Sequence, residues 1–187
     1  NEIRKELGLE DKFVVGHVGR LHPQKNHDFL IDVFAEIKKK KSDAELILVG
    51  TGPLEEKVKS KVAEKGLSGC VHFLGNRKDM NRIYQAMDVF VFPSLFEGLG
   101  IVAIEAQAAG VPIVCSEGLP PETDITPIYR KLLLSDGAEK WANAALEMAQ
   151  NPSAHTNMQK YVIDTGFDMD ATAKYMESYY LNRWSRR

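Results

Sequence analysis

Short apolar runs alternate regularly with helix-patterned segments along most of this sequence. Six β-branched or apolar runs recur: "KFVVGHVG", "AELILVG", "CVHFLG", "DVFVFP", "VPIVCS" and, less clearly, "RKLLL". Their apolar character is nearly continuous and does not alternate with polar residues, which is typical of strands covered on both faces. The sequence therefore predicts a sheet that lies between two layers of helices.

The segments between these runs carry the periodicity of helices. The stretch "NHDFLIDVFAEIKKKK" places its apolar residues on one stripe, and "PLEEKVKSKVAEKG" begins with proline and acidic residues and ends at a glycine. A short helix is expected at 79–87, and an alanine-rich one from Leu99 or Gly100 onward. Strands that alternate with helices favour right-handed crossovers, so we predict an α/β fold with a Rossmann-like, doubly wound parallel sheet.

The chain length and the pattern after Ser135 define the expected organisation. With 187 residues the chain is long enough for one domain with a sizeable core. After Ser135 the pattern is helical only, as in "GAEKWANAALEMAQN" and "DATAKYMESYYLNRW". We expect a single domain with a linker at 1–11, an α/β core at 12–135 and extra C-terminal helices at 136–187. The charged start, with Asn1 in place of an initiator methionine, suits a linker cut from a longer protein.

Composition excludes several classes of protein. The chain is 44% hydrophobic and 27% charged, with a formal net charge of -2, so it gives no indication of a nucleic-acid partner. Cys70 and Cys115 lack the spacing of a metal knuckle, and we expect buried thiols in a reducing compartment. No apolar run approaches the roughly 20 residues that span a bilayer, and no signal core is present. The sequence predicts a cytoplasmic protein.

In a doubly wound sheet, ligands bind beyond the carboxyl ends of the strands, so the loops there deserve the search for a site. "GRLHPQKN" offers Gly19, which permits close backbone approach, with Arg20 and Lys25, whose charges suit phosphate oxygens. Taken alone, such residues are also common on exposed loops. "GNRKDM" follows the third strand, and "PSLFEGLGI" follows the fourth.

The loop "FEGLGIV" places two glycines before a helix, where free backbone N–H groups and the helix dipole can hold an anion. A plain tight turn would also use glycines. Glu97 and Glu105 flank this turn, eight positions apart, which is at most about 12 Å if the interval were helical. They cannot form a tight carboxylate dyad. They can face the two ends of a diphosphate that carries hydroxyl groups on both sides, as a nucleotide sugar does.

For Glu105, pairing with a nearby cation is the simpler structural explanation. Its neighbours are mainly alanines, however, which indicates a closely packed helix in which a carboxylate needs a specific partner.

These loops and their order resemble the C-terminal, donor-binding domain of retaining GT-B glycosyltransferases of family 4. The resemblance covers nearly the whole chain, through "GRL" with a lysine five residues after the arginine, "LILVGTGPLEE", "VHFLGNRKDM", "DVFVFPSLFEGLGIVAIEAQAAGVPIV" and "YMESYYLNRW". The two glutamates with seven residues between them are its most specific mark. The subset that the chain resembles acts in bacterial capsular and exopolysaccharide synthesis.

The resemblance implies a role for each matching position. Arg20 and Lys25 would hold the donor diphosphate and stabilise the leaving group, and Glu97 would contact the transferred sugar; these three are the implied catalytic residues. Glu105 would bind the ribose hydroxyls. The remaining implied contacts are Gly19 beside the diphosphate, the backbone amides of Gly98, Leu99, Gly100, Ile101 and Val102 toward phosphate and sugar, and Asn76 and Arg77 beside the base.

The resemblance also implies the partners. The donor would be a nucleotide sugar, most commonly of uridine, with neither a metal nor another cofactor, and the acceptor a saccharide or a lipid-linked sugar. A separate N-terminal domain would bind the acceptor and close the cleft, so we expect this chain alone to bind nucleotide weakly and to transfer no sugar. Membrane contact, if any, would come through that other half, and the full-length enzyme would be cytoplasmic or peripheral at the inner membrane.

One loop departs from the family pattern, and other functions stay open. In "SEGLPPETDIT", Glu122 matches the family's glutamate, but Leu119 replaces a glycine and two prolines stiffen the turn, so the resemblance implies no particular contacts from this loop. The alternatives are a GT-B-fold sugar-nucleotide epimerase or hydrolase, or a non-catalytic nucleotide-binding module. "GTGPLE" begins like a dinucleotide fingerprint, but Glu55 occupies the third glycine position, which disfavours an NAD role.

The sequence also predicts the surroundings of several histidines and of a C-terminal aromatic stripe. His17 and His72 fall within strand patterns and are expected to be packed and hydrogen-bonded, whereas His22 is expected in a solvated loop, with a role at the diphosphate as the alternative. The stripe at helical spacing is expected to pack against its own domain, with dimerisation as the alternative if it is exposed. It comprises Tyr175, Tyr179, Tyr180 and Trp184.

Overall fold

Six parallel strands form one sheet in the order β3-β2-β1-β4-β5-β6 in the computed structural model, which describes residues 2–184. The predicted doubly wound α/β fold is confirmed, and each of the six apolar runs forms a strand. Sequence order reverses beside β1, where β2 and β4 are its two neighbours. The strands are β1 Phe13–Val18, β2 Ala44–Val49, β3 Val71–Gly75, β4 Val89–Phe92, β5 Ile113–Ser116 and β6 Tyr129–Leu132.

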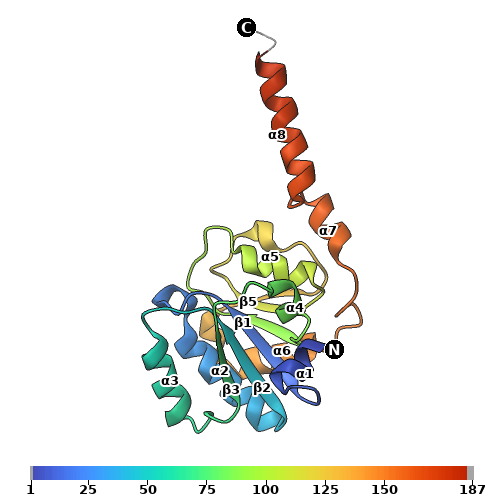
Figure 1. The fold of residues 1–187 in the computed structure, drawn as a ribbon. Coiled ribbons are helices and arrows are strands. Elements are labelled where there is room, and N and C mark those ends of the chain that lie inside the picture. The colour runs from blue at the N-terminus through green and yellow to red at the C-terminus, as the bar shows by residue number, and fades with distance from the viewer. Residues whose placement is uncertain (1, 185–187) are drawn as a thin grey trace.

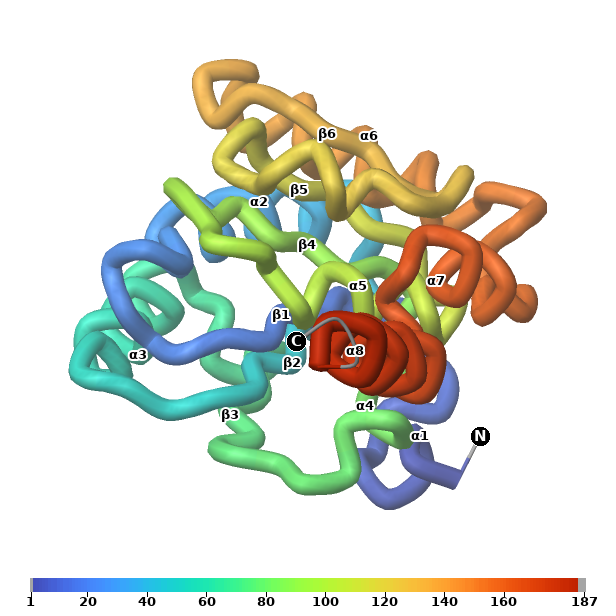
Figure 2. The backbone as a smooth tube through the Cα atoms, turned by 90° about the horizontal axis from the view of Figure 1, so that it is seen from above, coloured from blue at the N-terminus to red at the C-terminus, as the bar shows by residue number. Residues whose placement is uncertain are grey.

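Helices cover both faces of the sheet and bury two separate apolar cores. On one face lie α2 (His27–Lys40), α3 (Glu55–Glu64) and α6 (Ala138–Met148), and on the other lie α1 (Glu2–Leu7), α4 (Met80–Tyr84) and α5 (Ile101–Ala108). Figure 2 shows α2 and α3 on one side of the row of strands and α1, α4 and α5 on the other. Short 3₁₀ turns are η1 Pro23–Lys25, η2 Pro121–Thr123 and η3 Leu134–Asp136.

The two ends of the chain attach to this body differently. In the segment that was expected as a linker, Ile3 is 2% exposed and the guanidinium of Arg4 lies 2.8 Å from the Asp88 carboxylate, so α1 belongs to a helix layer. Toward the other end, Trp141 of α6 is fully buried and donates its indole N–H to the carbonyl of Leu133 at 2.9 Å. Helix α6 is therefore also part of the core.

After α6 the chain crosses to the opposite face, where α7 (Gln159–Asp164) lies beside α5. The backbone N–H of His155 donates to the carbonyl of Gly110 at 2.7 Å. A Cβ at Gly110, whose φ is +77°, would lie only 2.6 Å from the carbonyl oxygen of Thr156. This close approach, which requires glycine, holds the crossing segment against the end of α5.

Helix α8 (Met169–Trp184) projects away from the α/β body, as Figure 1 shows. None of its residues is buried, and the side chains of Tyr175 and Trp184 are 65% and 80% exposed. The expectation that the aromatic stripe packs against its own domain is therefore wrong, because no other described element covers this helix. Within residues 2–184, no helix is both long and apolar enough to cross a membrane.

Both cysteines are buried and free, as predicted. Burial raises the pKa of the Cys115 thiol to about 12 and also raises that of Cys70. Both side chains therefore stay protonated at neutral pH and pack as small apolar groups.

Candidate functional site

A cleft of about 530 Å³ opens beyond the carboxyl ends of β1, β2 and β3, against the first turn of α5. Parallel strands end at one edge of the sheet, so residues that are distant in sequence meet there. The cleft gathers six of the residues predicted for the site, namely Gly19, Arg20, Asn76, Arg77, Val102 and Glu105, with Val18, Val49, Gly50, Thr51 and Met80 completing its walls. Arg20 is exposed and forms no ion pair with any of the described residues.

Two glycine loops meet at the floor of this cleft. A Cβ at Gly50, where φ is +125°, would lie 2.2 Å from the carbonyl oxygen of Gly19, so the two backbones approach to a distance that only glycine allows. The N–H of Gly19 donates to the carbonyl of Val49 at 2.9 Å. Sequence analysis identified Gly19 and missed Gly50, although "LVGTG" has the strand-then-glycine signal that marks such an approach.

The loop before α2 and the loop before α5 are joined by three hydrogen bonds. The N–H of Leu95 donates to the carbonyl of Gln24 at 2.8 Å, and the Gln24 amide donates to the carbonyl of Phe96 at 2.9 Å. The third is an ion pair, in which the Lys25 ammonium donates to Glu97 Oε1 at 2.6 Å. Two of the residues predicted to be catalytic are thus in direct contact, and we refer to them as the Lys25–Glu97 pair.

The Lys25–Glu97 pair is largely shielded from water. The side chain of Lys25 is 15% exposed and that of Glu97 is 7% exposed. The ammonium lies 4.7 Å from the centre of the Phe92 ring, and the stem of Lys25 lies against Gly19, where an added Cβ would come within 3.0 Å of it. Low exposure strengthens the attraction between the two charges and raises the cost of leaving either one unpaired.

The loop after β5, whose sequence departs from the family pattern, contacts Glu97 through its backbone. The N–H of Glu97 donates to the carbonyl of Gly118 at 2.9 Å, and a Cβ at Gly118 would lie 2.4 Å from the carbonyl oxygen of Leu95. Leu119 is 2% exposed and fills the core beside α5, which accounts for an apolar residue at this position. Glu122 is exposed on η2.

The turn from Glu97 to α5 presents unused backbone donors. Gly100 adopts a left-handed conformation with φ +72° and precedes α5 without a side-chain cap. Among residues 2–184, no acceptor takes the amide hydrogens of Ile101 and Val102. Gly98 and Leu99 are exposed in the same turn. These N–H groups and the helix dipole are thus available to an anion at the end of the cleft.

Glu105 has a specific partner, as expected, but this partner is a phenol and not a cation. The Tyr84 hydroxyl donates to Glu105 Oε2 at 2.8 Å and lies 3.3 Å from the carbonyl oxygen of Val102. Burial, followed by the nearby Glu105 charge, raises the pKa of Tyr84 above its usual range. Tyr84 was missed by sequence analysis, which treated 79–87 only as a short helix; a buried tyrosine hydroxyl that needs a partner is the available signal.

The loop after β3 places Asn76 and Arg77 at the rim of the cleft. Arg77 forms a bidentate pair with Asp79, from Nε to Oδ1 at 2.9 Å and from Nη2 to Oδ2 at 2.7 Å. This pairing lowers the pKa of the Asp79 carboxyl and fixes the plane of the guanidinium. Asn76 Oδ1 accepts from the Thr51 hydroxyl at 3.5 Å.

Both strand histidines are hydrogen-bonded, as predicted, and His17 is also packed in the core, whereas the His72 side chain is 37% exposed. His17 Nδ1 lies 2.9 Å from the carbonyl oxygen of Val91, and His72 Nε2 lies 2.9 Å from Glu45 Oε2. His22 is exposed. Sequence analysis did not single out His27, which is 3% exposed at the start of α2, with its ring centre 4.7 Å from that of His17.

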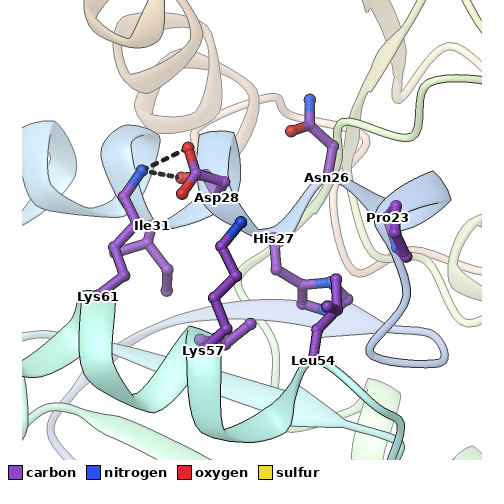
Figure 3. A pocket seen from close by; sticks show the side chains of 9 residues that line it. Pro23, Asn26, His27, Asp28, Ile31, Leu54, Lys57 and Lys61 are labelled. Carbon is purple, nitrogen blue, oxygen red and sulfur yellow. Dashed lines mark hydrogen bonds and ion pairs between the residues drawn. The ribbon is translucent and has the colours of Figure 1, made fainter.

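His27 also lines a smaller pocket of about 220 Å³ between α2 and α3, as Figure 3 shows. Neither ring nitrogen of His27 has a partner among the described residues. Burial, followed by the positive charge of Lys25, lowers the pKa of His27 to about 4. The rim of the pocket carries Lys61, which is paired with Asp28 at 2.8 Å.

The sequence of this chain is similar to that of known proteins. Residues 1–182 match the family described as "Glycosyl transferases group 1". The chain belongs to this family. Among curated relatives, EpsF of Bacillus subtilis (strain 168) is 35% identical over 140 residues, covering 74% of this chain and 36% of EpsF. A GDP-mannose-dependent monoacylated alpha-(1-6)-phosphatidylinositol monomannoside mannosyltransferase of Corynebacterium glutamicum is 33% identical over 160 residues, covering 80% of this chain and 41% of that enzyme.

Two solved structures share the fold. Sucrose-phosphate synthase from Thermosynechococcus elongatus superposes with a TM-score of 0.84 at 28% identity, over 100% of this chain and 49% of the other. HepE of Anabaena, solved in complex with UDP and glucose, superposes with a TM-score of 0.79 at 23% identity, over 97% of this chain and 51% of the other. This group 1 glycosyltransferase domain thus spans about half the length of these two structures. Within residues 2–184, no three His, Cys, Asp or Glu side chains are grouped to hold a metal ion.

Proposed function

We propose that this group 1 glycosyltransferase domain is the donor-binding half of a retaining enzyme that moves a sugar from a nucleotide diphosphate sugar to a saccharide or lipid-linked acceptor. One observation carries the proposal: a single cleft gathers the unpaired Arg20 and the Tyr84-oriented Glu105, beside the free amides of α5 and the Lys25–Glu97 pair. Each of these groups complements one part of a nucleotide sugar.

The cationic groups and amides suit the diphosphate. Arg20 and Lys25, together with the N–H groups at the start of α5, hold the phosphate oxygens and stabilise the negative charge that develops as the nucleotide diphosphate leaves. As the bond between the anomeric carbon and the diphosphate oxygen breaks, the acceptor hydroxyl oxygen bonds to that carbon from the same face, which gives retention, and the hydroxyl proton passes to the departing phosphate oxygen. We propose that these cationic side chains and N–H groups provide the electrostatic stabilisation and that no metal ion takes part.

The two glutamates accept hydrogen bonds from hydroxyl groups at opposite ends of the donor. Tyr84 fixes the orientation of the Glu105 carboxylate, which binds the ribose hydroxyls through its remaining lone pairs. Glu97 orients the transferred sugar. The base lies beside Asn76 and Arg77, where backbone groups recognise it.

We also propose which base the donor carries and in which kind of synthesis the enzyme acts. The solved HepE complex contains UDP, whereas the corynebacterial relative is named for GDP-mannose, so uridine is our choice on the basis of the structural neighbour. We propose a role in bacterial exopolysaccharide or capsular synthesis, supported by the likeness to EpsF. Because the chain spans 36% of EpsF, we propose that acceptor binding and cleft closure need a second domain, and that this domain alone transfers no sugar.

Calorimetric titration with UDP, GDP and ADP, in the absence and then the presence of Mg²⁺, tests the proposal. Arg20→Ala and Glu105→Ala are each expected to weaken binding of the preferred nucleotide by about tenfold, the cost of a lost charge-assisted hydrogen bond. Lys59→Ala, on the exposed surface of α3, is the matched control and should leave the affinity unchanged. Equal binding by all of these variants would contradict the assigned cleft, and the absence of binding by any nucleotide would contradict the proposed function.

A further inference from the structure

The Lys25–Glu97 pair joins two groups that the proposed function uses for different parts of the donor. The 2.6 Å contact occupies the Lys25 ammonium with a carboxylate, although the diphosphate is the intended partner of that ammonium. It likewise occupies the Glu97 carboxylate, which the sugar hydroxyls are meant to use. A donor that enters the cleft must therefore rearrange this pair.

Glu97 is the only acidic side chain that balances the charge of Lys25 within the described residues. The other groups around the ammonium are the Phe92 ring and the histidines His17 and His27. Burial and nearby positive charge keep both imidazoles neutral at pH 7, so neither can replace the carboxylate. When Lys25 turns to a phosphate oxygen, Glu97 loses the one cation that pairs with it among the described residues, at a position where the carboxylate is 7% exposed in the paired state.

We propose, on the basis of the proposed function, that Glu97 determines specificity by competing with the diphosphate for Lys25, so that the cleft favours a nucleotide sugar over the bare nucleoside diphosphate. A nucleotide sugar brings hydroxyl groups that donate to Glu97 as Lys25 moves to the phosphates. A bare diphosphate binds the Lys25 ammonium but has no sugar hydroxyl that could donate a hydrogen bond to Glu97. Leaving a shielded carboxylate without a partner costs binding free energy.

The same competition favours product release. After transfer, the nucleoside diphosphate stays in the cleft and the sugar hydroxyls leave with the acceptor. Glu97 then regains Lys25 as its partner, which weakens the hold on the product. Substrate and product thus differ in affinity through one shared lysine.

Calorimetry on four proteins tests this inference: wild type, Glu97→Gln, Lys25→Met and the double variant, each titrated with UDP and UDP-glucose. Glu97→Gln is expected to bind UDP about tenfold more tightly, because Lys25 no longer needs to leave a carboxylate. The preference for UDP-glucose over UDP should fall by a similar factor. In the Lys25→Met background, the same Glu97→Gln change should alter UDP affinity by less than about twofold. Lys25→Gln replaces Lys25→Met if the latter does not fold.

Unchanged or weaker UDP binding by Glu97→Gln overturns the competition. A tenfold gain that persists without Lys25 also overturns it, since simple repulsion between Glu97 and the phosphates would then explain the gain. If UDP binds to wild type and Arg20→Ala weakens it, the proposed function stands regardless of the result at Glu97. If none of UDP, GDP and ADP binds to wild type, the proposed function fails and this inference fails with it; if GDP binds in place of UDP, GDP and GDP-mannose replace the two ligands in this test.

Discussion

Acidification should destabilise this domain through His27, the buried histidine at the start of α2. Its pKa is lowered to about 4, against 6.5 for an unperturbed ring, by burial and then by the charge of Lys25. Between these values the unfolded chain takes up a proton that the folded domain excludes, so the free energy of unfolding falls as the pH falls. With these two pKa values, His27 alone should lower it by about 2 kcal/mol between pH 7 and pH 5. His17, whose pKa is also lowered by burial, acts in the same direction.

Urea unfolding at pH 7, 6 and 5, followed by circular dichroism, measures this effect. Other groups also titrate in this range, so the informative quantity is the difference between the wild type and His27→Phe, which keeps an aromatic ring of similar size. The variant should lose about 2 kcal/mol less than the wild type between pH 7 and pH 5, with an unchanged urea dependence. Parallel losses in the two proteins would show that His27 titrates normally in the folded state, contrary to this prediction.

Two further predictions concern the residues that shape the cleft. Gly50→Ala should destabilise the fold by about 3 kcal/mol, because a Cβ would meet a backbone carbonyl at 2.2 Å with φ at +125°, whereas Gly69→Ala, which has open space, should change stability by less than about 1 kcal/mol in the same urea assay. Similar losses in both would contradict the close approach. Tyr84→Phe should weaken UDP binding about fivefold by releasing the Glu105 carboxylate, with a loss of about 1 kcal/mol in stability. Unaltered UDP affinity would mean that Glu105 needs no such orientation.

The fold could be predicted because five of its six strands carry a clear apolar signal, and only β6 is less distinct. All six residues of β2 are buried, for example, so the run "AELILV" is apolar on both faces apart from Glu45, which pairs with His72. The cleft could be located because the carboxyl ends of parallel strands share one edge. The presence of Arg20 and Glu105 in the cleft could be predicted from that geometry and from the chemistry of their side chains.

Pairwise contacts could not be predicted in the same way. Nothing local in the sequence indicates that Lys25 meets Glu97, since 72 positions separate them and the pairing depends on how two loops cross. The approach of Gly50 to Gly19 and the hydroxyl of Tyr84 at Glu105 depend on the same tertiary detail. Periodicity likewise predicted the aromatic stripe of α8, but it cannot say whether another element covers that stripe.

Because α8 projects from the α/β body, a small change in its angle moves its far end by several ångströms. Sixteen residues of helix extend about 24 Å, and α8 meets the α/β body through α7 and the crossing segment that Gly110 holds. A tilt of about 10° where α7 joins α8 would displace the far end by about 4 Å, a simple consequence of helix length. Any tilt of α8 relative to the α/β body would therefore change the distance between Trp184 and the sheet, and a pair of labels at these two places would measure it.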